Sequence, residues 1–266
     1  LMSAPRSLAA VNAAAKVGDI DSALRLARMI DPGPGVRWRH VLWNTVLKAC
    51  AKAYSHERAI DIFQEITSKG VKTTHRTFGK LVTTGARSGS LQNAEFWFNT
   101  MKHHSVEATA IHHHAMLDAA AKACDVSASQ RWLSKLLHAG FAVDTRAMTS
   151  YLDAFAKVGD HANAAVWFKT LVVRGVVPDR ETFNTMMNAA AKAASLRTAE
   201  DWFQKMLAHQ IRPDASTYEI LVHAAAKAED PCAARRWFSV LVNSGFHPSR
   251  AVCNSLLSGT ASGGLA

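Results

Sequence analysis

Basic side chains recur at a regular interval along this chain and are its most evident candidates for chemistry. They follow one another at steps of 35 residues, after a first step of 36, at Lys16, Lys52, Arg87, Lys122, Lys157, Lys192 and Lys227. Evenly spaced cations suit a linear polyanion, because each can neutralise one phosphate along a strand. A second interpretation stays open, since a cation near the end of a helix also complements the helix dipole and aids solvation.

Polar side chains precede each of these cations at a spacing of four residues. Asn184, Asn188 and Lys192 stand at i, i+4 and i+8, and successive steps of four on a helix drift by only about 40°. The corresponding triplets are Asn44, Lys48 and Lys52; Gly79, Thr83 and Arg87; His114, Asp118 and Lys122; Thr149, Asp153 and Lys157; and Glu219, His223 and Lys227. If the helices that carry them lie side by side, the triplets line one surface.

The period of the cations extends to the rest of the sequence. Tryptophan recurs every 35 residues at Trp97, Trp132, Trp167, Trp202 and Trp237, and the pentapeptide AAAKA occurs at 119–123, 189–193 and 224–228. A fixed period without insertions is the signature of a repeat array. We interpret the alanines and tryptophans as packing residues, because small side chains let helices approach closely and the tryptophans fall on an apolar face.

Each unit is predicted to be a pair of helices. In 180–214 the residues Phe183, Met186, Met187 and Ala190 follow the i, i+3, i+4, i+7 pattern of one apolar helix face. A second such face follows, with Ser195 as its expected N-cap and Pro213 as its expected stop. The sequence therefore predicts an all-α fold, a right-handed α-solenoid of tandem 35-residue helix-turn-helix repeats, although the pattern alone does not give the hand.

The repeat register also sets the expected boundaries. Residues 1–39 are interpreted as a degenerate N-terminal repeat, 250–257 as a partial C-terminal repeat and 258–266 as a flexible tail. Between them lie six full repeats, at 40–74, 75–109, 110–144, 145–179, 180–214 and 215–249. The chain begins with Leu1 rather than Met, so we expect a fragment or a processed product.

Composition narrows the classes of partner. The chain has 31 Lys and Arg against 21 Asp and Glu, a net charge of +10, which favours a polyanionic partner. No apolar run approaches the roughly 18 residues of a membrane span. The cysteines share no short spacing and form no CxxC motif, so we expect free thiols rather than a zinc or redox site, at Cys50, Cys124, Cys232 and Cys253.

A group of histidines could be mistaken for a metal site. Imidazole is a common zinc ligand, and the group comprises His103, His104, His112, His113 and His114. The register places His113 where other units have Phe78 or Phe183, in a core position, and His103 and His104 fall at the end of the preceding helix. We therefore expect core and surface roles, with no metal and no cofactor.

Three features recur together in these units. They are the 35-residue period, the Pro-Asp dipeptide that ends the units in VPD at 177–179 and RPD at 212–214, and the sequence TFNTMMNAAAKA…AEDWFQKM. In these features the sequence resembles the pentatricopeptide repeat family. The resemblance covers 4–257 and is most specific over 145–249, whereas tetratricopeptide units of about 34 residues would drift out of register.

The resemblance implies single-stranded RNA as the partner and a mitochondrion or plastid as the location. In that family each repeat contacts one base, chiefly through its fifth and last residues, and a lysine at the place of Lys192 faces phosphates. The implied base-reading residues are Asn44, Thr74, His114, Asp144, Thr149, Asp179, Asn184, Asp214, Glu219 and Ser249. The implied phosphate-binding residues are Lys52, Arg87, Lys122, Lys157, Lys192 and Lys227.

Two pairs resemble readers of particular bases. Thr149 with Asp179 resembles a guanine reader, and Asn184 with Asp214 resembles a uracil reader. Elsewhere the sequence departs from the family pattern: Gly79 with Thr109 offers little to read with, His114 with Asp144 is unusual, and Glu219 with Ser249 places a carboxylate where an RNA binder rarely has one. No target beyond a short GU core is predicted.

No catalytic function and no small-molecule substrate are expected. A deaminase extension of the kind found in that family would need an H-x-E motif and paired cysteines for zinc, and this chain has neither. The leading hypothesis is a non-catalytic single-stranded RNA-binding protein of organellar RNA metabolism, in processing, stability, editing or translation. The alternative is a structural α-solenoid scaffold that contacts protein subunits of a larger ribonucleoprotein, such as an organellar ribosome.

Overall fold

The computed structural model describes residues 4–36 and 38–262, and over these residues it contains helices and no strand. The helices are α1 (Ala4–Val17), α2 (Ile20–Ile30), α3 (Arg39–Ala53), α4 (His56–Ser68), α5 (His75–Arg87), α6 (Leu91–His103), α7 (Ala110–Lys122), α8 (Val126–His138), α9 (Thr145–Val158), α10 (His161–Val173), α11 (Arg180–Lys192), α12 (Leu196–Ala208), α13 (Ala215–Lys227), α14 (Pro231–Asn243) and α15 (Arg250–Ser262). The predicted all-α fold of tandem 35-residue helix pairs is confirmed.

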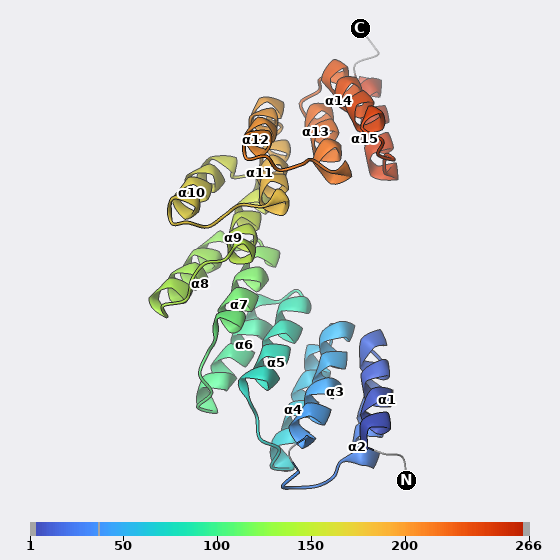
Figure 1. Cartoon of the computed structure of the whole chain (residues 1–266), viewed down its shortest axis with the longest axis vertical. Helices are drawn as coiled ribbons and strands as arrows, with labels where there is room; N and C mark the ends of the chain where they lie inside the picture. The colour runs from blue at the N-terminus through green and yellow to red at the C-terminus, as the bar shows by residue number, and fades with distance from the viewer. Residues whose placement is uncertain (1–3, 37, 263–266) are drawn as a thin grey trace. The chain divides into compact units, whose positions relative to one another are not determined.

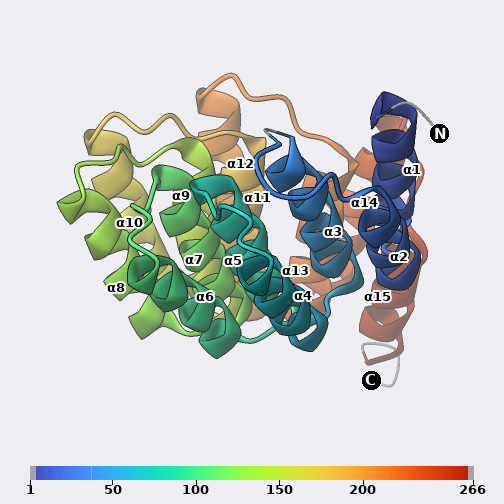
Figure 2. The same cartoon turned by 90° about the horizontal axis from the view of Figure 1, so that it is seen from below.

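The chain divides into two compact units. Unit 1 ends at Ala123 and also takes in Trp132–Ala139, whereas unit 2 holds Cys124–Arg131 and the chain from Gly140 onward. In unit 1, α3 packs against α1 and α5, and α5 packs against α7; in unit 2, α11 packs against α9 and α13, and α13 against α15 (Figures 1 and 2). The first helices of the repeats therefore form a side-by-side row within each unit.

The cores lie between the helices of a pair and between neighbouring pairs. In the unit 180–214 the predicted apolar faces are confirmed, because Phe183, Met186 and Met187 are fully buried and Trp202 and Phe203 nearly so. The apolar periodicity of each helix is thus what directs it toward its neighbours.

Two tryptophans, the buried Trp132 and the partly buried Trp237, also link successive second helices through their ring nitrogens. The Nε1–H of Trp132 donates to Glu95 Oε1 at 3.3 Å, and that of Trp237 to Glu200 Oε1 at 2.8 Å. A tryptophan ring inserted between helices needs such a partner, since an unpaired buried N–H would cost free energy.

The second helices end through backbone geometry rather than through proline. Ser195 occupies the N-cap position of α12 as predicted, but Pro213 does not stop that helix, which ends at Ala208. Gln210 adopts a φ of 58°, its N–H donates to the Leu207 carbonyl at 2.8 Å, and the Ile211 N–H donates to the Met206 carbonyl at 3.1 Å. This pair of bonds is a Schellman motif, and it closes the helix before the loop that holds Pro213.

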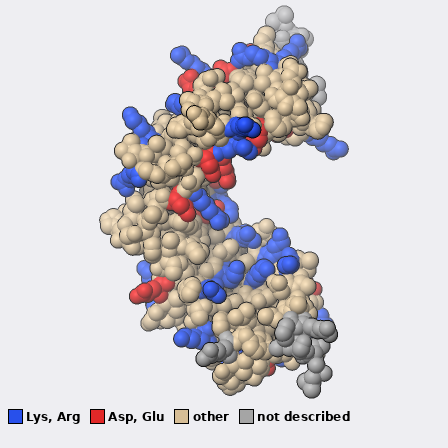
Figure 3. All heavy atoms as spheres, viewed as in Figure 1, with Lys and Arg blue, Asp and Glu red and all other residues tan. Residues whose placement is uncertain are grey.

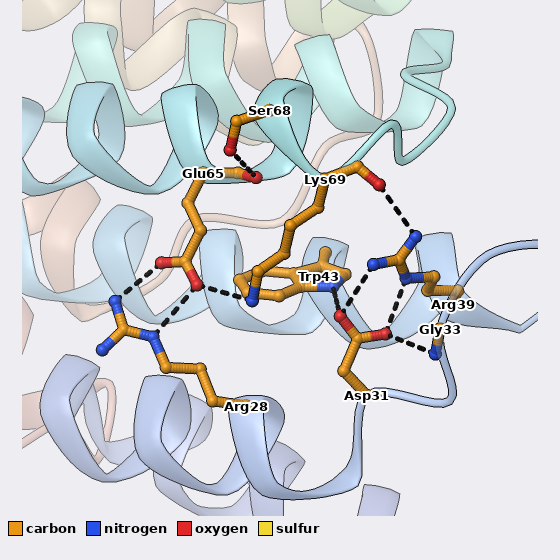
Figure 4. A network of polar contacts seen from close by, with 8 residues as sticks. All are labelled: Arg28, Asp31, Gly33, Arg39, Trp43, Glu65, Ser68 and Lys69. Carbon is orange, nitrogen blue, oxygen red and sulfur yellow. Dashed lines mark hydrogen bonds and ion pairs between the residues drawn. The ribbon is translucent and has the colours of Figure 1, made fainter.

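A polar network fixes the turn between the first two helix pairs (Figure 4). Asp31 accepts from Arg39 Nε at 2.6 Å, from Arg39 Nη2 at 3.0 Å and from Trp43 Nε1 at 3.3 Å. Arg39 also donates to the Lys69 carbonyl at 3.0 Å. The hydrogen bond from Arg39 is the main reason that the pKa of Asp31 is lowered. The largely buried ion pair is therefore supported by several further hydrogen bonds, which is the condition under which such a pair is tolerated.

The last helix extends further than the sequence pattern predicts. The partial repeat was expected to end at residue 257, whereas α15 continues to Ser262. No proline lies in this stretch to interrupt the helix. The predicted tail at 258–266 therefore begins inside a helix, and its residues 263–266 lie outside the described residues.

Within the part of the chain that the structure describes, no helix combines the length and the apolar character needed to cross a bilayer.

Candidate nucleic-acid interface

The recurring cations all lie in the last turn of a first helix. This holds for Lys16, Lys52, Arg87, Lys122, Lys157, Lys192 and Lys227, and all of them are exposed except the half-buried Lys157. Because neighbouring first helices pack side by side, the first four cations follow one another along unit 1 and the last three along unit 2. The structure thus brings the predicted phosphate-binding residues into one row in each unit.

Two cations of the row are already paired with carboxylates. Lys122 Nζ lies 2.7 Å from Asp118 Oδ2, and Lys157 Nζ lies 2.7 Å from Asp153 Oδ2, each one helical turn away. An exposed i, i+4 pair such as Lys122–Asp118 contributes only about 0.3–0.5 kcal/mol, so a phosphate can compete for that lysine. The aspartates nevertheless reduce the local positive charge, which the cation pattern alone did not reveal.

The last residue of each repeat caps the next first helix. Asp179 Oδ1 accepts from the Thr182 N–H and the Thr182 hydroxyl, both at 2.8 Å. Asp214 Oδ1 accepts from the Thr217 N–H at 3.0 Å and hydroxyl at 2.9 Å, while its Oδ2 lies 3.3 Å from Arg180 Nη1. Burial alone would raise the pKa of Asp214, but the bonds from Thr217 and the Arg180 charge outweigh it and lower that pKa.

Capping is common to the other predicted last residues. Thr74 and Thr109 close capping boxes with Thr77 and His112, and Asp144 accepts from the Ala147 N–H at 2.8 Å. N-capping side chains contribute about 1 kcal/mol to a helix. A structural role therefore accounts for the recurrence of polar residues at this position, in addition to any contact with a base.

The fifth and last residues of each predicted pair in unit 2 are brought together. The Thr149 hydroxyl lies 2.8 Å from the Thr182 hydroxyl, and Thr182 in turn donates to Asp179. Both predicted members of the pair are therefore joined through a threonine that the sequence pattern did not single out. The recurrence of threonine at the third place of a repeat was the available signal.

The two following pairs are joined in related ways. The Thr217 hydroxyl is 2.9 Å from both Asn184 Oδ1 and Asp214 Oδ1. Glu219 Oε1 accepts directly from the Ser249 N–H at 2.9 Å. Glu219 is consequently held by the backbone of its partner residue, and this bond gives its unexpected carboxylate a structural role.

The first helices of unit 1 enclose a cleft of about 610 Å³. Asn44 and Gly79 line it, and a Cβ added to Gly79 would meet only His112 Nε2, at 3.8 Å. The missing side chain of Gly79 therefore leaves open space. The Lys, Arg and His residues that line the cleft are His40, Lys48, His75, Arg76, Lys80 and His112. No Asp or Glu lines it.

Charge differs between the first-helix rows of the two units. Lys and Arg atoms gather around α3 and α5 in unit 1, and Asp and Glu atoms lie near α9 and α11 in unit 2 (Figure 3). Arg76 and Lys80 contribute to the basic surface of unit 1. Neither was among the predicted phosphate-binding residues, because neither place carries a cation in every repeat.

Two histidines of α7, His112 and His113, are structural. His112 is buried, its Nδ1 accepts from the Thr109 N–H at 3.1 Å, and its Nε2 lies 3.0 Å from the His75 carbonyl. His113 occupies the predicted core position, with its ring 5.4 Å from that of Phe98. Burial lowers the pKa of both imidazoles. Among the described residues, no three His, Cys, Asp or Glu side chains gather as a metal site would require.

Two models of protein families match the part of the chain that holds the repeats. The model of the pentatricopeptide repeat-containing proteins matches residues 40–171, and that of the PPR repeat family matches 179–227. No curated protein matches the sequence.

The chain is also similar to solved repeat structures. PPR10 in complex with an 18-nt psaJ RNA element has a TM-score of 0.83 at 20% identity, covering 99% of this chain and 38% of that one. PPR10 from maize gives 0.65 at 18%, covering 99% and 42%. The PPR domain of Arabidopsis thaliana protein-only RNase P 1, in complex with tRNA, gives 0.56 at 15%, covering 70% and 97%.

At these identities the structural likeness concerns the fold, and the chain spans well under half the length of PPR10. The two family models together match most of residues 40–227, the stretch in which the structure shows tandem 35-residue helix pairs. The chain therefore belongs to the pentatricopeptide repeat family.

Proposed function

We propose that this chain is a non-catalytic protein that binds single-stranded RNA along its rows of first helices. The observation that carries the proposal is the cleft of unit 1, which is lined by Lys48, Arg76 and Lys80 and by no carboxylate. Neutralisation of phosphates supplies a large share of the affinity of nucleic-acid-binding proteins. The solved complexes of PPR10 and of the RNase P domain with RNA support the same class of ligand.

The polar groups of unit 2 would inspect bases. The threonine bridges hold Thr149 near Asp179 and Asn184 near Asp214 before any ligand arrives. Discrimination between bases depends on donors and acceptors held in fixed positions. We therefore retain the two pairs as readers of a short GU word, and we place the action of the protein in organellar RNA metabolism.

The structural scaffold of a ribonucleoprotein is the second candidate. It is favoured by the Glu219 carboxylate, which is bound to the Ser249 backbone, and by the pairing of Lys157 with Asp153. Such a protein would contact RNA by shape and charge, without preference for sequence.

Selection from a pool of short single-stranded RNAs separates the two candidates. The intact chain is expected to enrich GU-containing words. The matched variant Asn184→Thr copies the Thr149–Asp179 pair into the next repeat, so it should enrich guanine where the natural chain enriches uracil. Binding that depends on salt but enriches no word would support the scaffold. A folded chain that binds no RNA would refute the RNA-binding proposal and leave only a scaffold that contacts proteins.

A further inference from the structure

Helix α10 exposes apolar side chains on its outer side. Val166 is 62% exposed, Val173 is 79% exposed and Val177, in the loop that follows, is 74% exposed. Val166 and Val173 share a helix face with Ala162 and Lys169, which are also exposed. The opposite side of α10 buries Phe168 and Leu171. The helix is therefore apolar on both sides.

The other second helices serve as internal controls. At the repeat position of Val166, the other second helices carry Asp61, Phe96, Arg131, Asp201 and Arg236. The place of Val173 is taken by Ser68, His103, His138, Ala208 and Asn243. Among these helices α10 alone has an aliphatic branched residue at both places. The valines are thus a local departure from the repeat pattern and not a requirement of the fold.

An exposed apolar patch on an otherwise polar surface marks an interaction site. We propose that the outer face of α10, with Val177, docks an amphipathic helix of a partner protein that carries acidic side chains beside its apolar stripe.

The acidic character of the partner follows from the charges around the valines. No Asp or Glu occurs between His161 and Val177, whereas Lys169 and Arg174 are exposed beside Val173. Asp160, at the start of the helix, is engaged by the N–H and Nδ2 of Asn163 at 3.1 and 2.7 Å. The surface over α10 is largely uncharged, with Lys and Arg at its margins (Figure 3).

The same charges argue against two other occupants. A second copy of the chain would bring Lys169 and Arg174 against their own counterparts or against other parts of a chain of net charge +10. A lipid surface is best engaged by bulky Trp, Phe and Leu side chains, whereas this face offers valines. A helix with leucines or valines flanked by carboxylates satisfies both the apolar face and the cations.

The surface is distinct from the proposed RNA-binding row. The exposed residues of α10 belong to a second helix, while the row in unit 2 is formed by Lys157, Lys192 and Lys227 on first helices. RNA and the partner helix would therefore use different residues.

The test is a selection of helical peptides from a display library on the full chain. The counter-selection uses the variant Val166→Asp with Val173→Asp. The matched control is Gln204→Asp with Ala208→Asp, which adds the same charges at exposed positions of α12, at the register places of Lys169 and Val173. Circular dichroism checks that both variants keep the helical content of the natural chain.

The enriched peptides are expected to carry an apolar i, i+3, i+4 stripe flanked by Glu or Asp. Titration of the best peptide should give a Kd raised at least about tenfold by the double valine variant, raised several-fold by Lys169→Glu and unchanged in the α12 control. Enriched peptides with basic flanks, peptides that bind the valine variant equally well, or a selection with no enrichment would each overturn the proposal.

Two further outcomes would assign the face to another occupant and so overturn the proposal. One is a dimer of the natural chain in analytical ultracentrifugation that the valine variant abolishes. The other is binding to phosphatidylserine vesicles that the same variant abolishes. RNA binding is measured on the same samples, and its presence or absence leaves the peptide result interpretable on its own.

Discussion

Several helix ends depend on single residues in the left-handed backbone region. Among the described residues, those other than glycine with a positive φ are Tyr54, Ser105, Cys124, Ala194, Gln210 and Glu229. This conformation crowds the Cβ of an L-amino acid and costs roughly 1 kcal/mol. At Ser105, Ala194, Gln210 and Glu229 a pair of Schellman bonds offsets the cost, so the strain can be relieved by substitution without losing the motif.

Gln210→Gly is therefore expected to raise the free energy of unfolding by about 0.5–1 kcal/mol, because glycine adopts the φ of 58° without a Cβ clash. The reverse change, Gly175→Ala, should lower it by about 1 kcal/mol, since Gly175 has a φ of +87° and its added Cβ meets no atom within 4 Å. Urea denaturation measures both. A loss of stability in Gln210→Gly would contradict the assignment of strain.

Gly85 permits the close approach of α5 and α6. A Cβ at this position would lie 2.6 Å from the Ala94 nitrogen and the Asn93 carbonyl carbon, both of them backbone atoms. Gly85→Ala should lower the free energy of unfolding by about 1–3 kcal/mol, because the helices must separate. Gly79→Ala is the control: its Cβ has room, so stability should stay equal or rise by up to about 1 kcal/mol. Equal losses in both variants, measured by thermal unfolding, would show that the close approach is not the cause.

At the scale of the elements, the residue at this same register place should set how closely the two helices of a pair approach. Where α5 has Gly85, α7 has Ala120, α11 has Ala190 and α9 has Phe155, and Phe155 is almost fully buried. A phenyl ring fills space that the alanine and glycine units close by direct helix contact. Pairs that share one sequence pattern therefore need not share one packing distance.

The start of α7 should respond to pH. His112 closes a capping box with Thr109, and burial lowers the pKa of His112 from its ordinary value of 6.5. As the pH falls through about 6.5, His112 is therefore protonated in the unfolded chain before it is protonated in the folded chain. The contribution of neutral His112 to the free energy of unfolding is fully present above that pH. It is lost as the pH falls toward the lower pKa of the folded state.

His112→Thr should reduce this dependence, because threonine closes the same box at Thr77, Thr182 and Thr217. The difference in the free energy of unfolding between about pH 7.5 and 5.5 is expected to shrink in the variant. Part of the difference will remain, because burial also lowers the pKa of His113. An unchanged difference would mean that His112 does not contribute to the acid sensitivity.

At the scale of the whole molecule, the two units differ in the charge of their first-helix rows. Lys48 and Lys80 line a cleft without carboxylates in unit 1. Lys192 and Lys227 share the row of unit 2 with Asp153 and Glu219. Carboxylates beside a lysine reduce the potential that a phosphate experiences, so the two units should contribute unequally to RNA binding.

The expected result is that Lys48→Gln with Lys80→Gln weakens binding to single-stranded RNA more than Lys192→Gln with Lys227→Gln does. Both variants remove the same charge, so each is the control for the other. The slope of log K against log salt should fall by about 0.7 for each phosphate that the variant no longer neutralises. Equal reductions of affinity and slope would show that the lysines of the two units contribute equally to RNA binding.

The sequence by itself determined the period, the helix pairs, the family and the recurring cations. These are properties of spacing along one dimension: apolar residues at helical intervals and a 35-residue register need no knowledge of neighbours. The same register predicted the core position of His113 and the sharing of one stripe by Asn184 and Lys192. The helix stop predicted at Pro213 was wrong, because residue type does not show that Gln210 takes a left-handed φ.

The tertiary structure decided which groups meet. Thr182 bridges Thr149 and Asp179, and Thr217 bridges Asn184 and Asp214, because packing brings particular atoms within hydrogen-bonding distance. The basic cleft of unit 1 likewise combines Arg76 and Lys80, whose places do not carry a cation in every repeat. Such interactions join residues up to a repeat apart, and their distances depend on how adjacent helices pack, which a one-dimensional pattern does not contain.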